Sequence, residues 1–236
     1  MPKERLRFGG PSELTTEEAD IIYDIVIDKE PIKVVEFPTF GGKATLYIAE
    51  ALRDLNGGQV YSFDYVDRGI EPDAQEWING HHVSDYVGLI KVDDLDDLIA
   101  KLKSTLRNTN LLFLDSLHVD IEKVWEAVEP SLSDNITLVF HDVECEPSEE
   151  MKTPAFFKKL ASSVGFGDYR IYTTKDNAEN KNSIGVIDYK KVVEEIVAET
   201  LIADEAVPVI TKFEASKETK AVKKRRKKAT KKVQKG

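Results

Sequence analysis

The sequence predicts an α/β fold in which a doubly wound, mostly parallel sheet carries helices on both faces and one antiparallel strand near its C-terminal end. Short runs rich in β-branched residues alternate with amphipathic stretches of helical spacing, which is the pattern of repeated βαβ crossovers. Two strand-like runs late in the chain are joined by a short polar segment, so these two strands should be antiparallel. The chain has 236 residues, enough for one such domain with a full core.

Local signals place each element in the first half of the chain. Thr15 and Glu18 have the spacing of a capping box, which predicts a helix start. The run IKVVEF is short and β-branched, so it is predicted as a buried strand, and a Gly-Gly pair ends the helix that follows. In order, the predicted elements are a helix at 14–28, a strand at 32–37, a helix at 43–55, strands at 59–64 and 87–92, and a helix at 95–106.

In the second half of the chain, predicted strands and helices continue to alternate, and two strands without a helix between them follow. NLLFLD and ITLVFHD are apolar runs of strand length, and each is followed by a stretch of helical spacing, with Pro130 in the last turn of the first. KDNAENK is too short and too polar for a crossover helix. The predicted elements are a strand at 110–115, a helix at 121–132, a strand at 136–142, a helix at 154–164, strands at 168–174 and 182–189, and a final helix at 190–204.

Charge divides the chain into an acidic body and a basic tail. The whole chain has a net charge of −10, whereas residues 217–236 hold 11 Lys or Arg and one acid, and the other 216 residues have a net charge of −20. Apolar residues are sparse from 214 onward. We therefore predict an α/β domain at 1–213, with its core at 12–189 plus a C-terminal helix, and a disordered Lys/Arg-rich tail at 214–236.

The charge distribution limits the partners. A body of net charge −20 repels polyanions, which argues against broad binding of nucleic acid. The tail lacks aromatic residues for base stacking, so any contact of residues 217–236 with a polyanion should be non-specific and sensitive to salt. A localisation signal, a nucleic-acid arm and a tether to an anionic surface are alternatives to a solubilising tail or a weak tether, which we favour.

The sequence also indicates a compartment. Cys145 is the one cysteine, so no internal disulfide can form, which fits a reducing environment. MPKERLRFGG lacks the apolar core of a signal peptide, and no apolar run reaches the roughly 18 to 20 residues of a membrane span. We therefore expect a cytoplasmic protein without a membrane span. The sequence makes no prediction about the oligomeric state.

The loop after the first strand, VVEFPTFGGKAT, carries the first candidate binding residues. It places Glu36 at the end of a strand and Gly41 and Gly42 before a helix. A phosphate loop is excluded, because Phe37 stands where its first glycine is needed and Ala44 where its Ser or Thr is needed. A glycine at this place lets the backbone approach a ligand, and the amides of a helix start favour an anion. The alternative is a strand-to-helix turn that holds no ligand.

Ionisable residues lie at or just after the carboxyl end of each of the first five predicted strands. The carboxyl ends of these strands meet at one edge of a doubly wound sheet, where ligands bind. One acid at a strand end is usually a turn residue or a helix cap, but five successive ends predict a shared site. These residues are Glu36, then Asp64, then Asp93 and Asp94, then Asp115 with His118, and then His141 with Asp142.

With these residues in place, the chain resembles the class I S-adenosylmethionine-dependent methyltransferases over roughly residues 12–189. Members typically read VVEIGTxxGxST at the first loop, where this chain has VVEFPTFGGKAT. The branch of small-molecule and sugar O-methyltransferases, similar to methyltransferase domain family 24, carries segments like FIDGDHSYEGV and LVFHDV. This chain has FLDSLHVDIEKV and LVFHDV at the corresponding places.

The resemblance implies a Rossmann-like fold and methyl transfer from S-adenosylmethionine to a hydroxyl group of a small molecule, such as a sugar or another diol. It implies that the cofactor is held by Glu36, Thr39, Gly42, Asp64 and Asp93, with Asp64 on the ribose and Asp93 near the adenine.

Methyl transfer to a hydroxyl needs an aligned acceptor and removal of its proton. His118 is the predicted base, since an unperturbed pKa of about 6.5 suits proton uptake at neutral pH. The alternative is a capping or loop histidine. Asp115 and Asp142 are predicted to place the acceptor, or to hold a divalent cation, Mg²⁺ or Mn²⁺, together with His141. A third carboxylate in place of His141 would suit Mg²⁺ better.

One residue departs from the family loop, because Pro38 replaces its first glycine. Proline has no N–H and fixes φ near −65°. One backbone donor is therefore missing where the amino-acid end of the cofactor would pack. This leaves open a second prediction, a methyltransferase-like fold without catalysis that acts as a binding or assembly module through its basic tail.

Overall fold

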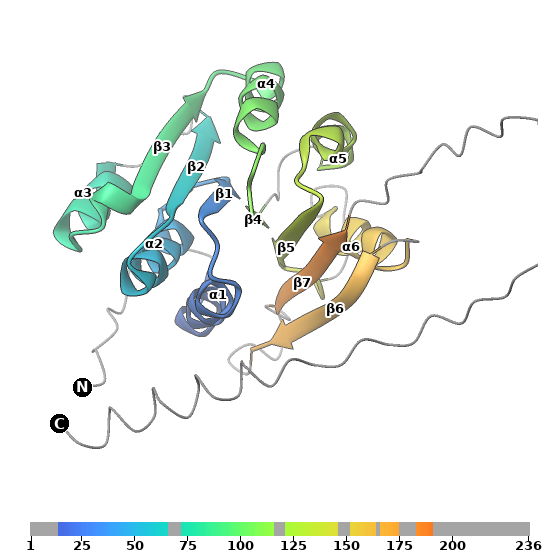
Figure 1. Cartoon of the computed structure of the whole chain (residues 1–236), viewed down its shortest axis with the longest axis horizontal. Coiled ribbons are helices and arrows are strands. Elements are labelled where there is room, and N and C mark those ends of the chain that lie inside the picture. Colours follow the sequence, from blue (N-terminus) through green and yellow to red (C-terminus); the bar gives the residue numbers. More distant parts are fainter. Residues whose placement is uncertain are drawn as a thin grey trace, which may run out of the picture. The chain divides into compact units, whose positions relative to one another are not determined.

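The described strands form one sheet with the predicted doubly wound order. A computed structural model describes residues 14–65, 72–115, 121–145, 152–163, 166–174 and 183–190. The strands are β1 Lys33–Phe37, β2 Gln59–Tyr65, β3 Val87–Val92, β4 Leu111–Leu114, β5 Asn135–His141, β6 Phe166–Thr173 and β7 Ser183–Lys190. Their order is β3-β2-β1-β4-β5-β7-β6 (Figure 1). Neighbours among the first five strands pair in parallel, and β7 is antiparallel to both β5 and β6.

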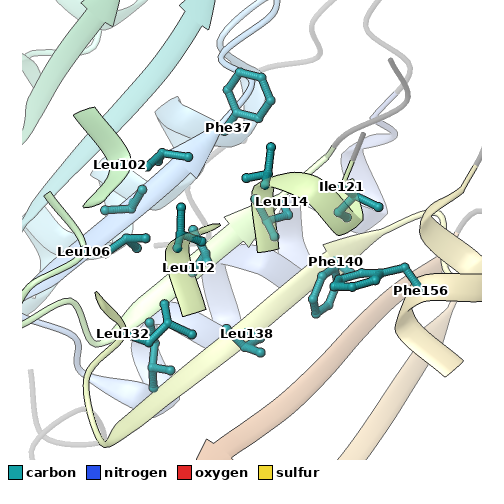
Figure 2. Packing of buried hydrophobic residues seen from close by; sticks show 14 of the residues in the cluster. Phe37, Leu102, Leu106, Leu112, Leu114, Ile121, Leu132, Leu138, Phe140 and Phe156 are labelled. Atoms are coloured by element: carbon teal, nitrogen blue, oxygen red, sulfur yellow. The ribbon is translucent and has the colours of Figure 1, made fainter. Parts of the chain in front are cut away.

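The helices cover both faces of this sheet (Figure 1). They are α1 Thr16–Lys29, α2 Lys43–Leu55, α3 Pro72–Gly80, α4 Leu95–Thr105, α5 Ile121–Val128 and α6 Thr153–Ala161, with 3₁₀ turns at Ser84–Tyr86 and Glu129–Ser131. Successive side chains of a strand point to opposite faces. Leu111 and Phe113 therefore pack with α1 and α2, whereas Leu112 and Leu114 pack with α4, α5 and α6. Figure 2 shows the second of these clusters, in which Leu112 and Leu114 lie near Leu102, Leu106 and Ile121.

The first helix begins at the predicted capping box. Thr15 Oγ1 accepts the N–H of Glu18 at 3.2 Å, and Glu18 Oε2 accepts the N–H of Thr15 at 2.8 Å. The two residues thus satisfy each other's backbone donors at a helix end, where such donors have no partner within the helix. This reciprocal pair fixes the first turn of α1, and it also places Glu18 inside the protein.

Two predictions about the elements need correction. The predicted helix at 121–132 ends at Val128, and a 3₁₀ turn follows, because Pro130 cannot donate to a continuing α-helix. The pattern predicts no helix between β2 and β3, but α3 lies there. Ala74 and Ile78, four residues apart, are its buried side chains among those described, and such a narrow apolar stripe gives little periodicity.

The C-terminal predictions lie almost wholly outside the described residues. Lys190, the first residue of the predicted final helix at 190–204, is instead the last residue of β7. The rest of that helix and the tail at 214–236 are not described, so both stay predictions. Among the helices of the described ranges, none combines the length and the apolarity that a membrane span requires.

Gly185 in β7 allows α6 and the segment after β5 to pack closely on the sheet. A Cβ at this position would lie 2.5 Å from a ring carbon of Phe157 and 2.7 Å from Val143. We expect Gly185→Ala to lower the free energy of unfolding by about 1–3 kcal/mol, because overpacking forces neighbouring side chains out of their rotamers. Urea denaturation measures this change. Gly57→Ala is the control, since a Cβ there meets no atom within 4 Å, and equal losses in the two variants would contradict the assignment.

Candidate functional site

The candidate site lies at the carboxyl ends of β1, β4 and β5. In the sheet register Phe37 pairs with Leu114, and Leu114 pairs with Phe140. The N–H of Asp115 then donates to the carbonyl of Phe37 at 2.9 Å. The strand order reverses between β1 and β4, since the chain continues from β1 to β2 and β3 on one side and from β4 to β5 on the other. This switch point is where doubly wound sheets bind ligands.

Glu36 is a fully buried acid at the end of β1. Its Oε2 accepts a hydrogen bond from Thr45 Oγ1 at 2.6 Å, while Oε1 has no hydrogen-bond partner in the described part of the chain. Burial first, and then the charges of Asp115 and Asp64, raise the pKa of Glu36 to about 8, against the opposing influence of the Thr45 and Ser62 hydroxyls. Glu36 is therefore mostly protonated at neutral pH.

The loop between β1 and α2 is fastened to the end of β2. The N–H of Thr39 donates to the carbonyl of Phe63 at 2.8 Å, and Thr39 Oγ1 lies 2.6 Å from Ser62 Oγ. Lys43, at the start of α2, donates instead to the carbonyl of Leu14 at 2.7 Å. Its ammonium group thus anchors the segment before α1, which agrees with the exclusion of a phosphate loop.

Asp64 holds the same loop through backbone amides. Its Oδ2 accepts the N–H of Phe40 at 2.6 Å, and its Oδ1 accepts the N–H of Tyr65 at 2.8 Å. Asp64 is only 1% exposed, whereas Phe40 is 48% exposed and has a left-handed backbone with φ 46°. A bulky residue rarely adopts this conformation, and the bond to Asp64 is one of the contacts that hold it. Asp64 therefore shapes the loop as well as being the predicted ribose ligand.

Gly42 has a structural reason to be glycine. Its φ is 77°, and a Cβ there would lie 2.8 Å from the Cβ of Ala74 in α3. At Gly41, in contrast, a Cβ would meet no atom of the described residues within 4 Å, so among these residues nothing packs against this part of the loop. The peptide bond between Phe37 and Pro38 is cis. Of the two glycines, Gly41 is thus the one with room for a ligand, although the sequence singles out Gly42.

Asp93 is placed apart from these acids. It is exposed at the end of β3, an outermost strand of the sheet, with β2 between it and β1. Its N–H donates to Asp97 Oδ2 at 3.0 Å, and the neighbouring Asp94 caps α4 by accepting the N–H of Asp97 at 2.9 Å. The structure therefore brings Glu36, Asp64 and Asp115 together but leaves Asp93 at the rim.

A buried imidazole joins three carboxylates at the ends of β4 and β5. His141 Nδ1 lies 2.9 Å from Asp115 Oδ1 and 3.4 Å from Asp142 Oδ2, and His141 Nε2 lies 3.0 Å from Glu18 Oε1. The side chains of His141 and Glu18 are 1% and 0% exposed, whereas that of Asp115 is 25% exposed. One end of this chain of contacts is thus inside the protein, and the other end reaches the surface at the switch point.

The charges of this cluster favour a protonated imidazole. Burial alone would lower the pKa of His141, but the charge and hydrogen bond of Asp115, together with Glu18 and Asp142, raise it well above its ordinary value. Burial would raise the pKa of Glu18, but its contacts with His141 and Thr15 lower it. Burial raises the pKa of Asp142, and the charge of His141 opposes this rise. The raised pKa of His141 thus favours the imidazolium form, in which both ring nitrogens donate, one to Asp115 and one to Glu18.

This arrangement bears on the predicted metal site of Asp115, His141 and Asp142. Glu18, His141 and Asp142 have donor atoms within 4.8 Å of one another, as metal ligands would need. A ring nitrogen that carries a proton has no lone pair for a metal, so an ion would have to displace a proton from His141. The divalent cation stays a prediction.

Sequence reasoning missed one residue of the site and named one that the structure does not describe. Glu18 has a signal in the sequence, the capping-box spacing, but that signal is fully explained by the start of α1. The contact with His141 depends on how α1 packs, which no local pattern gives. His118, the predicted base, lies in 116–120, outside the described residues, so its role stays a prediction.

Comparison with known proteins identifies the fold. Residues 35–143 match the family model described as a methyltransferase domain. The O-methyltransferase from Bacillus cereus, solved with S-adenosylhomocysteine, is similar with a TM-score of 0.63 at 12% identity, over 77% of this chain and 84% of that one. The O-methyltransferase TomG from Streptomyces achromogenes, solved with S-adenosylmethionine, has a TM-score of 0.61 at 14% identity, over 75% and 82%.

The fold extends to methyltransferases with a different acceptor. The tRNA (m1A58) methyltransferase TrmI from Aquifex aeolicus is similar with a TM-score of 0.56 at 16% identity, over 79% of this chain and 74% of that one. Among curated proteins, none matches this chain. At such identities the solved structures show the fold and leave the acceptor open. The family model and the fold agree, and they confirm that this chain has the class I S-adenosylmethionine-dependent methyltransferase fold, with a match to the methyltransferase domain family at residues 35–143.

Proposed function

We propose that the chain is an S-adenosylmethionine-dependent O-methyltransferase that acts on a hydroxyl group of a small molecule, such as a sugar or another diol. The observation that carries the proposal is the convergence of Glu36, Asp64 and Asp115 at the switch point, close enough for the latter two charges to raise the pKa of Glu36. The match to the methyltransferase domain family supports it. The similar structures solved with S-adenosylmethionine and S-adenosylhomocysteine support the choice of cofactor.

The residues of the site fit this cofactor, which combines a ribose diol with two cationic groups. The carboxylates of Asp64 and Asp115 attract cations, and Glu36 Oε1 is a buried polar atom without a partner among the described residues, so it can form a hydrogen bond with the ligand. Asp64 accepts the N–H of Phe40 and of Tyr65, and a carboxylate has about four acceptor sites on its two oxygens, so we propose that Asp64 also accepts a ribose hydroxyl. The space at Gly41 leaves the loop backbone approachable. Pro38 supplies no N–H, so the amino-acid end must be held without a donor at that position.

Each residue then has a proposed role. S-adenosylmethionine would supply an electrophilic methyl group on a sulfonium. Glu36, Thr39 and Gly42 would hold its amino-acid end, Asp64 would accept from its ribose, and Asp93, at the rim, would lie near its adenine.

The acceptor would lie against the exposed end of the His141 cluster. Asp115 Oδ1 contacts His141, and we propose that Asp115 Oδ2 accepts from the acceptor hydroxyl. Asp142 lies beside it, and His118 would remove the hydroxyl proton. The carboxylates thus hold the acceptor oxygen in line, which is the main requirement of a displacement at a methyl carbon.

Asp64→Asn tests the cofactor site. We expect the affinity for S-adenosylhomocysteine to fall about 10- to 100-fold, because a hydrogen bond to a charged group contributes about 1.5–3 kcal/mol. Calorimetric titration of the full chain measures this change. Asp96→Asn is the control, because that side chain is 90% exposed and lies at the start of α4.

The outcomes of this titration separate the alternatives. The same affinity in Asp64→Asn and wild type would contradict the ribose assignment. No binding of S-adenosylhomocysteine to the wild type at millimolar concentration would favour the second prediction, a methyltransferase-like fold without catalysis that binds partners through its basic tail. Melting temperatures of both variants, measured in parallel, show whether the loss of the Asp64 contacts with the loop lowers the stability of the fold.

A further inference from the structure

Glu18 makes more contacts than helix capping requires. Its Oε2 accepts from both the N–H and the hydroxyl of Thr15 at 2.8 Å, which completes the capping box. Its Oε1 accepts from His141 Nε2 at 3.0 Å, 123 residues further along the chain. The residue is fully buried, and it lies outside residues 35–143, which match the methyltransferase domain family. A helix cap needs only the first set of contacts, so the second set calls for its own explanation.

The contacts continue from Glu18 to the surface of the site. A ring that donates from both nitrogens to two carboxylates can neither rotate nor flip without losing a hydrogen bond. His141 Nδ1 in turn holds Asp115 Oδ1 at 2.9 Å, and the backbone N–H of Asp115 is fixed to the carbonyl of Phe37. The backbone and the side chain of Asp115 are thus each fixed by a hydrogen bond. The side-chain bond depends on the orientation of the His141 ring, which Glu18 holds through Nε2.

We propose that Glu18 is a positioning residue of the methyl-transfer site, which acts through His141 to hold the carboxylate of Asp115 in one orientation toward the acceptor hydroxyl. The role of Asp115 rests on the proposed function, whereas the orientation itself is a property of the protein without ligands. Buried carboxylates and ring N–H groups behind a reactive side chain commonly serve this purpose, since the reacting geometry must be held closely.

Glu18→Gln separates this role from capping. The carboxylate accepts three hydrogen bonds, two from Thr15 and one from His141, whereas a glutamine presents one oxygen and one NH₂ group. If the oxygen stays with Thr15, as capping allows, the NH₂ group faces Nε2 of His141. It can contact this nitrogen only as a donor to a neutral ring, so the charge-assisted bond that holds the ring is lost. Thr15→Ala is the matched control, because it removes the side-chain cap and leaves the Glu18 contact with His141.

Nuclear magnetic resonance on the full chain gives the readout. Three-bond couplings report the χ1 angle of Asp115, and ¹⁵N-labelled histidine reports the two hydrogen-bonded ring N–H signals of His141. In the wild type and in Thr15→Ala we expect a single χ1 rotamer for Asp115 and both ring signals. In Glu18→Gln we expect an averaged χ1 and the loss of the Nε2 signal. Glu18→Asp keeps the negative charge on a side chain that is one methylene shorter. In this variant we expect the χ1 angle of Asp115 to be partly averaged. Glu18→Asp replaces Glu18→Gln in the test if Glu18→Gln does not fold.

Two results would overturn the proposal. One is a single Asp115 rotamer in both Glu18 variants, which would mean that the carboxylate is held by other groups. The other is averaging in Thr15→Ala to the same extent as in Glu18→Gln, which would reduce Glu18 to a helix cap. A wild type that shows the expected rotamer but binds no S-adenosylhomocysteine in calorimetry would refute the proposed function and leave the orientation result standing.

Discussion

Replacing Glu36 by glutamine should remove a large part of the pH dependence of stability between about pH 5 and 8. Glu36 has an ordinary pKa of 4.5, and burial raises its pKa to about 8 in the folded protein. Between these values the unfolded chain has lost this proton and the folded chain keeps it, so the folded state binds more protons. The free energy of unfolding of the wild type therefore falls as the pH rises, by up to about 5 kcal/mol over the whole interval. A glutamine does not titrate, so this contribution disappears.

Urea denaturation of both proteins at pH 5, 6, 7 and 8 measures the effect. The difference in the free energy of unfolding between Glu36→Gln and the wild type should shift in favour of the variant as the pH rises, and level off above about pH 8. Glu76→Gln, at an exposed position of α3, is the control for removal of one carboxyl group. A difference between Glu36→Gln and wild type that stays constant from pH 5 to 8 would mean that Glu36 is ionised in the folded protein.

His141→Leu should be among the most destabilising single substitutions in the described part of the chain. It leaves the buried carboxylate of Glu18 without the imidazolium that faces it at 3.0 Å. Removing one partner of a buried ion pair costs about 3–5 kcal/mol, because an uncompensated charge stays inside the protein. Urea denaturation at neutral pH measures the loss.

A double-mutant cycle shows whether this loss comes from the stranded charge. The double variant Glu18→Gln and His141→Leu should be more stable than the two single losses predict, with a coupling of about 1–3 kcal/mol, because glutamine removes the stranded charge and can still accept from Thr15. Losses that add within about 0.5 kcal/mol would indicate that Glu18 and His141 act independently.

Much of the fold could be predicted because its signals are local. Two elements begin and end at the residues that the sequence predicts. The helix Lys43–Leu55 ends at a glycine pair, and the strand Val87–Val92 coincides with an apolar run. The acids at the strand ends could be predicted as a site because topology alone brings the ends of parallel strands to one edge. The helix α3 could not be predicted, because Ala74 and Ile78, the buried ones among its described side chains, give almost no pattern.

The parts of the site that escaped prediction are those set by tertiary contacts. The spacing of Thr15 and Glu18 gives the helix start and says nothing of His141, which lies on a distant strand. The acid at position 64 can be recognised as a strand-end carboxylate, but its hydrogen bond to the N–H of Phe40 depends on the conformation of the loop. The same holds for the raised pKa of Glu36, which comes from burial first and from Asp115 and Asp64 after that.

A crystal structure of the full chain with S-adenosylhomocysteine would show whether the ends of the sheet strands form the cofactor site. We expect the ligand to lie across the carboxyl ends of β1, β2 and β4, with its ribose hydroxyls on Asp64, its amino-acid end beside Glu36 and Thr39, and its sulfur facing Asp115. A ligand bound on another surface would refute this placement. So would crystals grown at millimolar ligand in which Asp64 keeps its bonds to the amides of Phe40 and Tyr65 without contacting the ligand, and Pro38 fills the place of the amino-acid end.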